Sequence, residues 1–294
     1  MKPAPFVYHR PDTLEAALSL LSDLTGDGEE AKVLAGGQSL LPVMALRLAA
    51  PAHLIDIGRL PDLDQITVDD GVVTIGALVR HAQAERSDVL ARHAPMVFQA
   101  MPWVGHRAIR TRGTVVGSIA HADPAAEMPA VCLALGATMH IKSADDTRTV
   151  EAADFFTGYL STALLENEIL TAVEFPDWSP TAGSAVVELS RRSGDFALLG
   201  LACGFETTAD GTVSDAALSF FGAGPTPVRV TEGEDALVGR LPTAETFAVV
   251  AEIVSDVIEP TADLHATTAY RKHIAGVLTR RGLDEAASRI VASV

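Results

Sequence analysis

The chain of 294 residues is poor in cysteine, which limits the metal chemistry that it can perform alone. Its two cysteines, Cys132 and Cys203, lie far apart and each sits in an apolar segment. An iron–sulfur cluster or a structural zinc ion is usually held by about four cysteine or histidine ligands, so neither is expected here. We interpret both residues as reduced core thiols. If the protein works with an iron–sulfur cluster, a partner chain must supply it.

Positive charge and long apolar runs are also scarce. Lysine and arginine number 22 against 38 aspartates and glutamates, a formal net charge of −16. Such a chain repels nucleic acid and anionic membranes, so neither is an expected partner. No apolar run reaches the roughly 18 residues of a membrane span, and residues 1–5 (MKPAP) do not look like a signal peptide. We therefore expect a cytoplasmic protein without a membrane span.

The motifs of several enzyme classes are missing as well. The glycine-bearing turns are not followed by Gly-Lys-Ser/Thr, as in a P-loop, and are not spaced as Gly-x-Gly-x-x-Gly, as in a Rossmann fold. The chain has no Gly-x-Ser-x-Gly elbow and no His-Glu-x-x-His motif. His121 is interpreted as a packing residue because no second ligand has metal-like spacing. No side chain is assigned as catalytic, so any redox chemistry would belong to a bound cofactor.

The chain does contain two glycine-bearing segments that suit phosphate binding. The first reads LAGGQSLLP at residues 34–42, and the second reads RGTVVGSIAHADP at residues 112–124. Each combines bare backbone N–H groups with a hydroxyl, and such groups bind phosphate oxygens. Two turns of this kind that face each other could hold a pyrophosphate, so a dinucleotide cofactor is the leading hypothesis. The first segment alone is equally compatible with an ordinary strand-to-helix turn.

Short strands and helices without regular alternation predict an α+β fold. We expect a helix that starts at residues 11–15 with Asp12 as its cap, mostly helical structure over 78–101, and a helix capped by Asp123 with Pro124 at its first position. Strands are predicted at residues 31–35, 53–57, 65–68, 72–75, 139–142, 148–150 and 168–175.

Residues 176–183 (PDWSPTAG) are the best linker candidate, because the pattern changes after them. Three further strands are predicted at residues 184–190, 197–207 and 213–221, and three helices at about 243–259, 266–281 and 283–292. We therefore predict two domains, residues 1–177 with sub-parts of about 1–57 and 58–177, and residues 184–294.

Two small basic clusters interrupt the acidic sequence. The first contains His106, Arg107, Arg110 and Arg112, and the second is RRSGDF at residues 191–196. We expect the first to be a solvated helix end. The alternative is a docking patch for an acidic partner.

Taken together, these motifs point to one family. Beyond the two glycine segments they include IRTRGT at residues 109–114, RRSGDFA at 191–197, GAGPTP at 222–227 and YRKH at 270–273. On these residues the chain resembles, over nearly its whole length, the FAD-binding medium subunit of molybdenum hydroxylases of the carbon monoxide dehydrogenase type. The resemblance implies a two-part FAD-binding domain of the vanillyl-alcohol oxidase (PCMH) type. A C-terminal domain with a small antiparallel sheet and helices would follow it.

The resemblance also implies how non-covalent FAD is bound. Residues 34–40 would wrap the diphosphate and residues 114–118 would contact it from the other side. Asp123 would bind the ribose side, and the segment around Arg191 and Asp195 would approach the flavin ring. Val116 stands where the family has glycine, and valine has less backbone freedom. The complete implied set is Leu34, Ala35, Gly36, Gly37, Gln38, Ser39, Leu40, Ile75, Thr114, Val116, Gly117, Ser118, Ala120, Asp123, Ile169, Leu170, Arg191 and Asp195, with Ile169 and Leu170 beside the adenine.

Partners follow from the same resemblance. A small subunit would carry two [2Fe-2S] clusters and a large subunit the molybdenum cofactor, in a dimer of heterotrimers. Electrons would pass from the clusters to FAD and then to a quinone, oxygen or NAD. The large subunit would choose the substrate, which this sequence leaves open. Two alternatives are a self-sufficient flavin-dependent oxidase or dehydrogenase, and a nucleotide-binding or assembly protein without a redox role.

Overall fold

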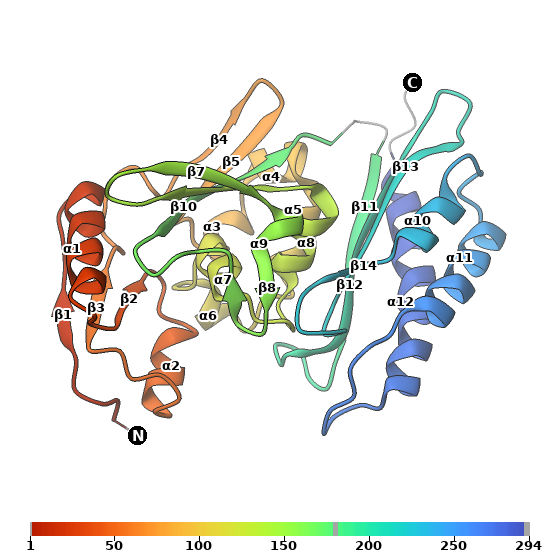
Figure 1. Cartoon of the computed structure of the whole chain (residues 1–294). Coiled ribbons are helices and arrows are strands. Elements are labelled where there is room, and N and C mark those ends of the chain that lie inside the picture. Colours follow the sequence, from red (N-terminus) through yellow and green to blue (C-terminus); the bar gives the residue numbers. More distant parts are fainter. Residues whose placement is uncertain (1, 179–181, 291–294) are drawn as a thin grey trace.

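The computed structural model describes residues 2–178 and 182–290, which form two units packed side by side (Figure 1). The first unit runs through strand β10 (Ile169–Pro176), and the second begins with β11 (Ala182–Ser190). Residues 179–181 of the expected linker lie outside the described residues, as do residues 291 and 292 of the last expected helix. Along the part of the chain that the structure describes, no helix is long and apolar enough to cross a membrane.

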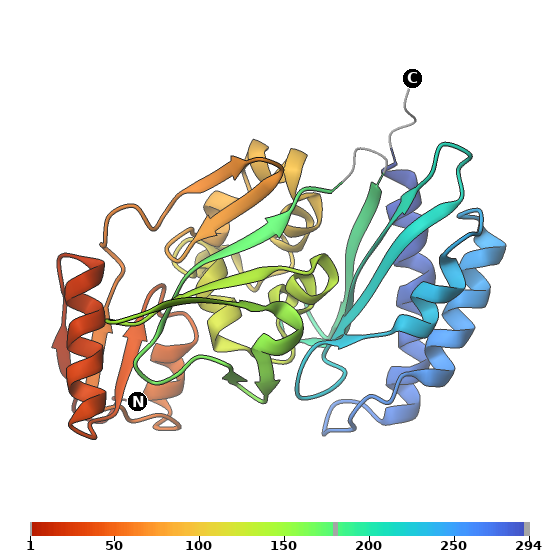
Figure 2. The same cartoon turned by 45° about the horizontal axis from the view of Figure 1, so that its top comes forward.

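The N-terminal part of the first unit is a small parallel sheet with a helix beside it (Figure 2). The sheet has the order β1 (Val7–His9), β3 (His53–Asp56), β2 (Ala31–Leu34). Helix α1 (Leu14–Gly26) connects β1 to β2 and buries an apolar stripe with helical spacing. The chain then turns from β2 into the short helix α2 (Leu40–Ala45).

The predicted cap of α1 is wrong by one residue. The hydroxyl of Thr13, and not the carboxylate of Asp12, accepts a hydrogen bond from the N–H of Ala16 at 3.1 Å. Both residue types are good caps, so the sequence alone could not choose between neighbours.

The helix predicted to start at Asp123 begins later. The carboxylate of Asp123 accepts a hydrogen bond from the N–H of Ala125 at 2.9 Å, which forms a tight turn. Helix α8 (Glu127–Leu135) follows, with Ala126 as its N-cap. Asp123 is therefore a turn residue that precedes the helix, and Pro124 is not in the first helical position.

The larger part of the first unit is an antiparallel sheet with the strand order β4-β5-β10-β6-β7. Short helices pack against it, and residues 78–101, expected to be mostly helical, form three separate short helices. The strands not yet given are β4 (Ile66–Asp69), β5 (Val72–Gly76), β6 (Thr138–Lys142), β7 (Thr147–Glu151), β8 (Phe156–Gly158) and β9 (Ser161–Thr162). The helices are α3 (His81–Ala84), α4 (Asp88–His93), α5 (Pro95–Ala100), α6 (Arg107–Arg110), α7 (Val115–His121) and α9 (Ala152–Phe155).

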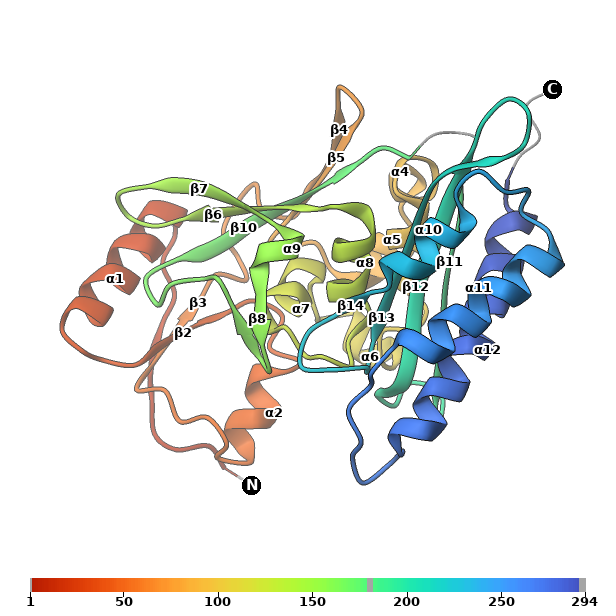
Figure 3. The same cartoon turned by 45° about the vertical axis from the view of Figure 1, so that its right-hand side comes forward.

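The second unit is an antiparallel sheet in the order β11-β12-β13-β14, covered on its outer face by helices (Figure 3). One face of the sheet packs against these helices, and the other packs against the first unit. The new elements are β12 (Ala197–Thr207), β13 (Val213–Phe221), β14 (Val228–Arg229), α10 (Thr231–Leu237), α11 (Ala244–Val257) and α12 (Thr268–Ser288). The predicted α+β fold, with a two-part first unit and a C-terminal sheet with helices, is confirmed.

Helix α12 corrects the expectation of two separate helices divided near residue 282. The helix is continuous through Gly282, where a Cβ atom would lie 2.6 Å from the Sγ atom of Cys203 on β12. The glycine is therefore a point of close approach between helix and sheet rather than a helix end. Helix α10 was not expected.

Replacing Gly282 by Ala should destabilise the protein by about 1–3 kcal/mol, because the added methyl group overpacks the α12–β12 contact. Chemical denaturation followed by circular dichroism would measure the loss. Gly26→Ala is the matched control, since a Cβ there meets no atom within 4 Å. Equal stability of the two variants would contradict the contact.

Candidate functional site

The two glycine segments, far apart in the sequence, touch in the structure. A Cβ atom on Gly36 would lie 2.4 Å from the carbonyl oxygen of Arg112 and 2.7 Å from the Cα atom of Gly113. The two segments also approach each other at a second pair of residues, because a Cβ atom on Gly117 would lie 3.8 Å from the Cβ atom of Ala35. Only a residue without a side chain fits at Gly36, so glycine there is required by the approach of the two turns.

The first turn presents a row of free backbone donors. The N–H groups of Gly36, Gly37, Gln38 and Ser39 have no hydrogen-bond acceptor among the described residues. Gly37 has a φ of 71°, and left-handed residues of this kind help successive N–H groups to form an anion-binding concavity. The turn leads from β2 into α2, so the strand-to-helix interpretation is also correct, and the two interpretations are compatible.

The second turn contributes one further donor beside it. Thr114 caps α7, because its hydroxyl accepts from the N–H of Gly117 at 3.1 Å. The N–H of Val116 has no acceptor in the described parts of the chain. The free donor of the second turn is therefore at the valine that departs from the family pattern, and the N–H of Gly117 already has a partner.

Arg80 and His81 also hold the second turn, a role that no sequence motif predicted. The N–H of His81 donates to the carbonyl of Gly113 at 3.0 Å, and the guanidinium of Arg80 donates to the carbonyl of Arg112. Burial lowers the pKa of His81 to about 4, so its imidazole is neutral at pH 7. Burial and the neighbouring Arg112 also lower the pKa of Arg80. Neither residue belongs to a turn motif, so only the fold reveals their role.

The remaining candidate residues lie around α7. This helix packs against β5 and β10, which carry the buried side chains of Ile75, Ile169 and Leu170. Ser118 and Ala120 are half-buried on α7 itself. The apolar candidates Ile75, Ile169 and Leu170 therefore lie on strands that pack against α7, the helix that follows the second turn.

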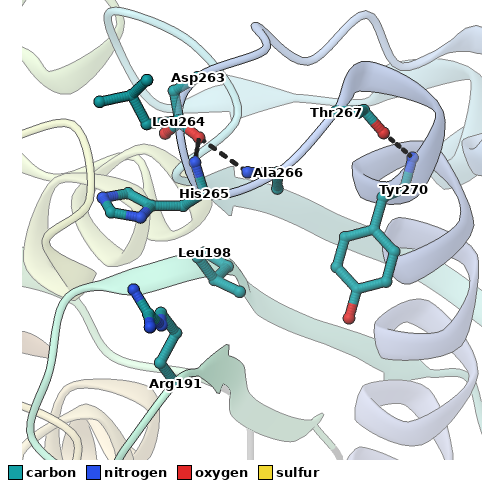
Figure 4. A pocket seen from close by; sticks show the side chains of 8 residues that line it. All are labelled: Arg191, Leu198, Asp263, Leu264, His265, Ala266, Thr267 and Tyr270. Atoms are coloured by element: carbon teal, nitrogen blue, oxygen red, sulfur yellow. Dashed lines mark hydrogen bonds between the residues drawn. The ribbon is translucent and has the colours of Figure 1, made fainter.

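Arg191 and Asp195 come from the second unit, on the connection between β11 and β12. This connection meets the first unit at His106, since a Cβ atom on Gly194 would lie 2.3 Å from the Nδ1 atom of His106. The neighbouring Phe196 leaves 73% of its surface exposed, which is unusual for an aromatic side chain. Arg191, on the same connection, lines a hollow of about 460 Å³ with His265 and Tyr270 (Figure 4).

In the first basic cluster, Arg110 has structural partners and the other three residues are exposed. Arg110 forms a two-pronged pair with Glu85 at 3.0 and 3.1 Å and also donates to the carbonyl of Gly105 at 3.0 Å. It is therefore structural, whereas His106, Arg107 and Arg112 are exposed. Among the described residues, no group of three His, Cys, Asp or Glu side chains could hold a metal ion.

Comparison with known proteins agrees with this geometry. Residues 4–178 match the FAD binding domain in molybdopterin dehydrogenase, and residues 184–286 match the CO dehydrogenase flavoprotein C-terminal domain. The chain belongs to this family. It is an FAD-binding subunit of the medium type found in molybdenum-containing oxidoreductases, as the resemblance predicted. The row of free N–H donors at residues 36–39 fits the diphosphate of that cofactor.

Individual relatives are similar over their full length. The chain is 38% identical over 289 residues to the nicotine 6-hydroxylase medium subunit of Paenarthrobacter nicotinovorans, covering 98% of this chain and 100% of the relative. It is 35% identical over 289 residues to the 6-hydroxypseudooxynicotine dehydrogenase complex subunit alpha of the same organism, covering 98% and 97%. A solved carbon monoxide dehydrogenase of Hydrogenophaga pseudoflava superposes with a TM-score of 0.93 at 35% identity, covering 99% of this chain and 100% of that one.

Removing Arg110 should cost stability, whereas removing its exposed neighbour should not. Arg110→Met leaves the partly buried Glu85 carboxylate without its cation, so we expect a loss of about 2–3 kcal/mol in urea denaturation. Arg107→Met on the same helix should change stability by less than about 0.5 kcal/mol. A similar effect of both substitutions would contradict the division of the cluster.

Proposed function

We propose that this chain is the electron-relay subunit of a molybdenum hydroxylase. It binds FAD without a covalent link, receives electrons from the [2Fe-2S] clusters of a small subunit and passes them to an external acceptor. A large subunit with the molybdenum cofactor hydroxylates or oxidises the substrate. The observation that carries the proposal is the row of free N–H donors at residues 36–39, held directly against the second turn.

Within this proposal, the FAD site is divided among three parts of the chain. The bound FAD supplies the redox chemistry, and the chain binds and orients it. The free N–H groups of the first turn and of Val116 donate to the diphosphate, and Asp123 accepts from a ribose hydroxyl. The backbone of β10 near Ile169 and Leu170 lies beside the adenine. Arg191 and Asp195 of the second unit approach the flavin ring.

The two cysteines support the need for partner subunits. Cys132 and Cys203 are both completely buried, one in the core of each unit. Burial strongly raises the pKa of the Cys132 thiol and raises that of Cys203 to about 12, so both stay protonated and cannot act as thiolate ligands. The clusters that feed the flavin therefore belong to another chain in this proposal.

The assembly and its setting are part of the same proposal. It includes a dimer of heterotrimers, a cytoplasmic location, and a division of this chain into domains at residues 1–177 and 184–294. The exposed residues His106, Arg107 and Arg112 are a candidate contact for the small subunit, because they form a positive spot on a chain of net charge −16.

Native purification through a tag on this chain tests the proposal directly. We expect a flavin absorption spectrum together with molybdenum, iron and two co-eluting chains. Flavin in a stable monomer or homo-oligomer that its own substrate reduces would instead establish a self-sufficient flavoenzyme. A colourless protein that rebinds no FAD would favour the nucleotide-binding or assembly alternative.

Gly36→Ala should weaken FAD binding, because the methyl group separates the two turns that supply the diphosphate donors. We expect the dissociation constant for FAD to rise by about tenfold or more, equivalent to ~1.4 kcal/mol. Fluorescence titration of the FAD-depleted protein would measure it. Gly224→Ala is the matched control, since its Cβ would meet no atom closer than 3.7 Å. Unchanged affinity in Gly36→Ala would contradict the assignment.

A further inference from the structure

A buried arginine of the second unit, Arg271 on α12, has no role yet in the proposed function. It is only 4% exposed, and each nitrogen of its guanidinium donates a hydrogen bond. Nε donates to the carbonyl of Leu198 at 2.9 Å, Nη1 to the carbonyl of Thr261, and Nη2 to the carboxylate of Asp263 at 2.7 Å. The guanidinium lowers the pKa of the Asp263 carboxyl to about 2, so this ion pair is charged at neutral pH. A buried cation needs such partners, so Arg271 fixes the segments that supply them.

Two of these segments support the turn that follows β13. Leu198 lies at the start of β12, and Thr261 lies on the connection between α11 and α12. A Cβ atom on Gly222 would lie 3.1 Å from the carbonyl oxygen of Leu198, the same oxygen that Arg271 binds. The carbonyl of the next residue, Ala223, accepts a hydrogen bond from the N–H of Thr261 at 2.8 Å. Arg271 therefore holds both of the backbone segments against which this turn rests.

The same turn joins the second unit to the first. The N–H of Gly222 donates to the carbonyl of Pro124 at 2.7 Å, and within residues 2–178 and 182–290 this is the one hydrogen bond between backbone groups of the two units. Gly222 has a φ of 74°, in the left-handed region that favours glycine. Pro124 lies in the tight turn that Asp123 closes by accepting from the N–H of Ala125. The second unit therefore holds the Asp123 turn directly.

The Asp123 turn is continuous with the proposed diphosphate site. Helix α7 carries the free N–H of Val116 in its first turn and ends at Ala122, which has the left-handed conformation of a helix C-cap. Asp123 follows directly, so one short helix joins a proposed diphosphate donor to the residue assigned to the ribose side. Hydrogen-bond networks and rigid elements of this kind transmit small displacements. A shift of the bond at Pro124 would therefore reach both groups.

We propose that Arg271 is a positioning residue for FAD, which acts on the Asp123 turn through the hydrogen bond from Gly222 to Pro124. This inference rests on the proposed FAD site. The groups that accept hydrogen bonds from Arg271 lie in the second unit, so its effect on the cofactor passes through the turn at Gly222. Arg271 thereby makes the second unit part of the support for the ribose end of the cofactor.

Fluorescence titration of the FAD-depleted full chain tests the role of Arg271. Arg271→Lys keeps the positive charge, but its single nitrogen cannot replace the three that bind Leu198, Thr261 and Asp263. We expect the dissociation constant for FAD to rise by about fivefold. Arg280→Lys, at an exposed position of the same helix, is the matched control and should bind FAD as the wild type does.

A double-mutant cycle with Asp123 separates positioning from a general loosening of the second unit. Asp123→Ala removes the carboxylate that closes the turn and accepts from the ribose, so it should weaken FAD binding alone. Adding Arg271→Lys to Asp123→Ala should then weaken binding no further, because the two substitutions act through the same turn. An equal loss from Arg271→Lys in both backgrounds would show that Arg271 acts by another route, and would overturn the inference.

The remaining outcomes separate this inference from the proposed function. A wild-type protein that binds no FAD would overturn the proposed function itself. Unchanged affinity in Arg271→Lys would overturn this inference alone, and unchanged affinity in Asp123→Ala would overturn it together with the ribose assignment. Should circular dichroism show that Arg271→Lys does not fold, Asp263→Asn takes its place in the same cycle. That variant removes the charge facing Arg271, and its amide oxygen can still accept from the N–H of Ala266.

Discussion

The site depends on one approach of backbone to backbone, between Gly36 and the peptide that joins Arg112 to Gly113. A side chain at Gly36 would overlap the Arg112 carbonyl, which a Cβ atom would reach at 2.4 Å. The contact brings the turn after the small parallel sheet against the turn before α7. The contact holds the two parts of the first unit together, and in the proposed FAD site the free N–H groups of both turns, at residues 36–39 and at Val116, would share one diphosphate.

Other contacts hold that approach in place. Arg80 and the backbone N–H of His81 donate hydrogen bonds to the carbonyls of Arg112 and Gly113 in the second turn. Just before this turn, Arg110 is held by its ion pair with Glu85. The contact of His106 with Gly194 then brings the β11–β12 connection of the second unit to the same helix-and-turn segment. Three separated stretches of sequence therefore meet around residues 106–117, which is the arrangement that an extended dinucleotide needs.

The sequence predicted elements well where local signals were strong. The strands at residues 197–207 and 213–221 have the predicted bounds, because alternation and an Asp-Gly turn mark both. Gly282 was misread as a break because its reason is a tertiary contact with Cys203. Arg80 and His81 were missed for the same reason, since their partners lie in a turn that begins thirty-two residues later.

The proposed diphosphate site is built from backbone N–H groups, which suits the charge of the chain. The chain has a net charge of −16, and two of the arginines near the turns already have structural partners, Glu85 for Arg110 and the Arg112 carbonyl for Arg80. Backbone N–H groups attract a diphosphate without adding a titratable cation. We therefore expect diphosphate binding at the proposed site to be insensitive to pH.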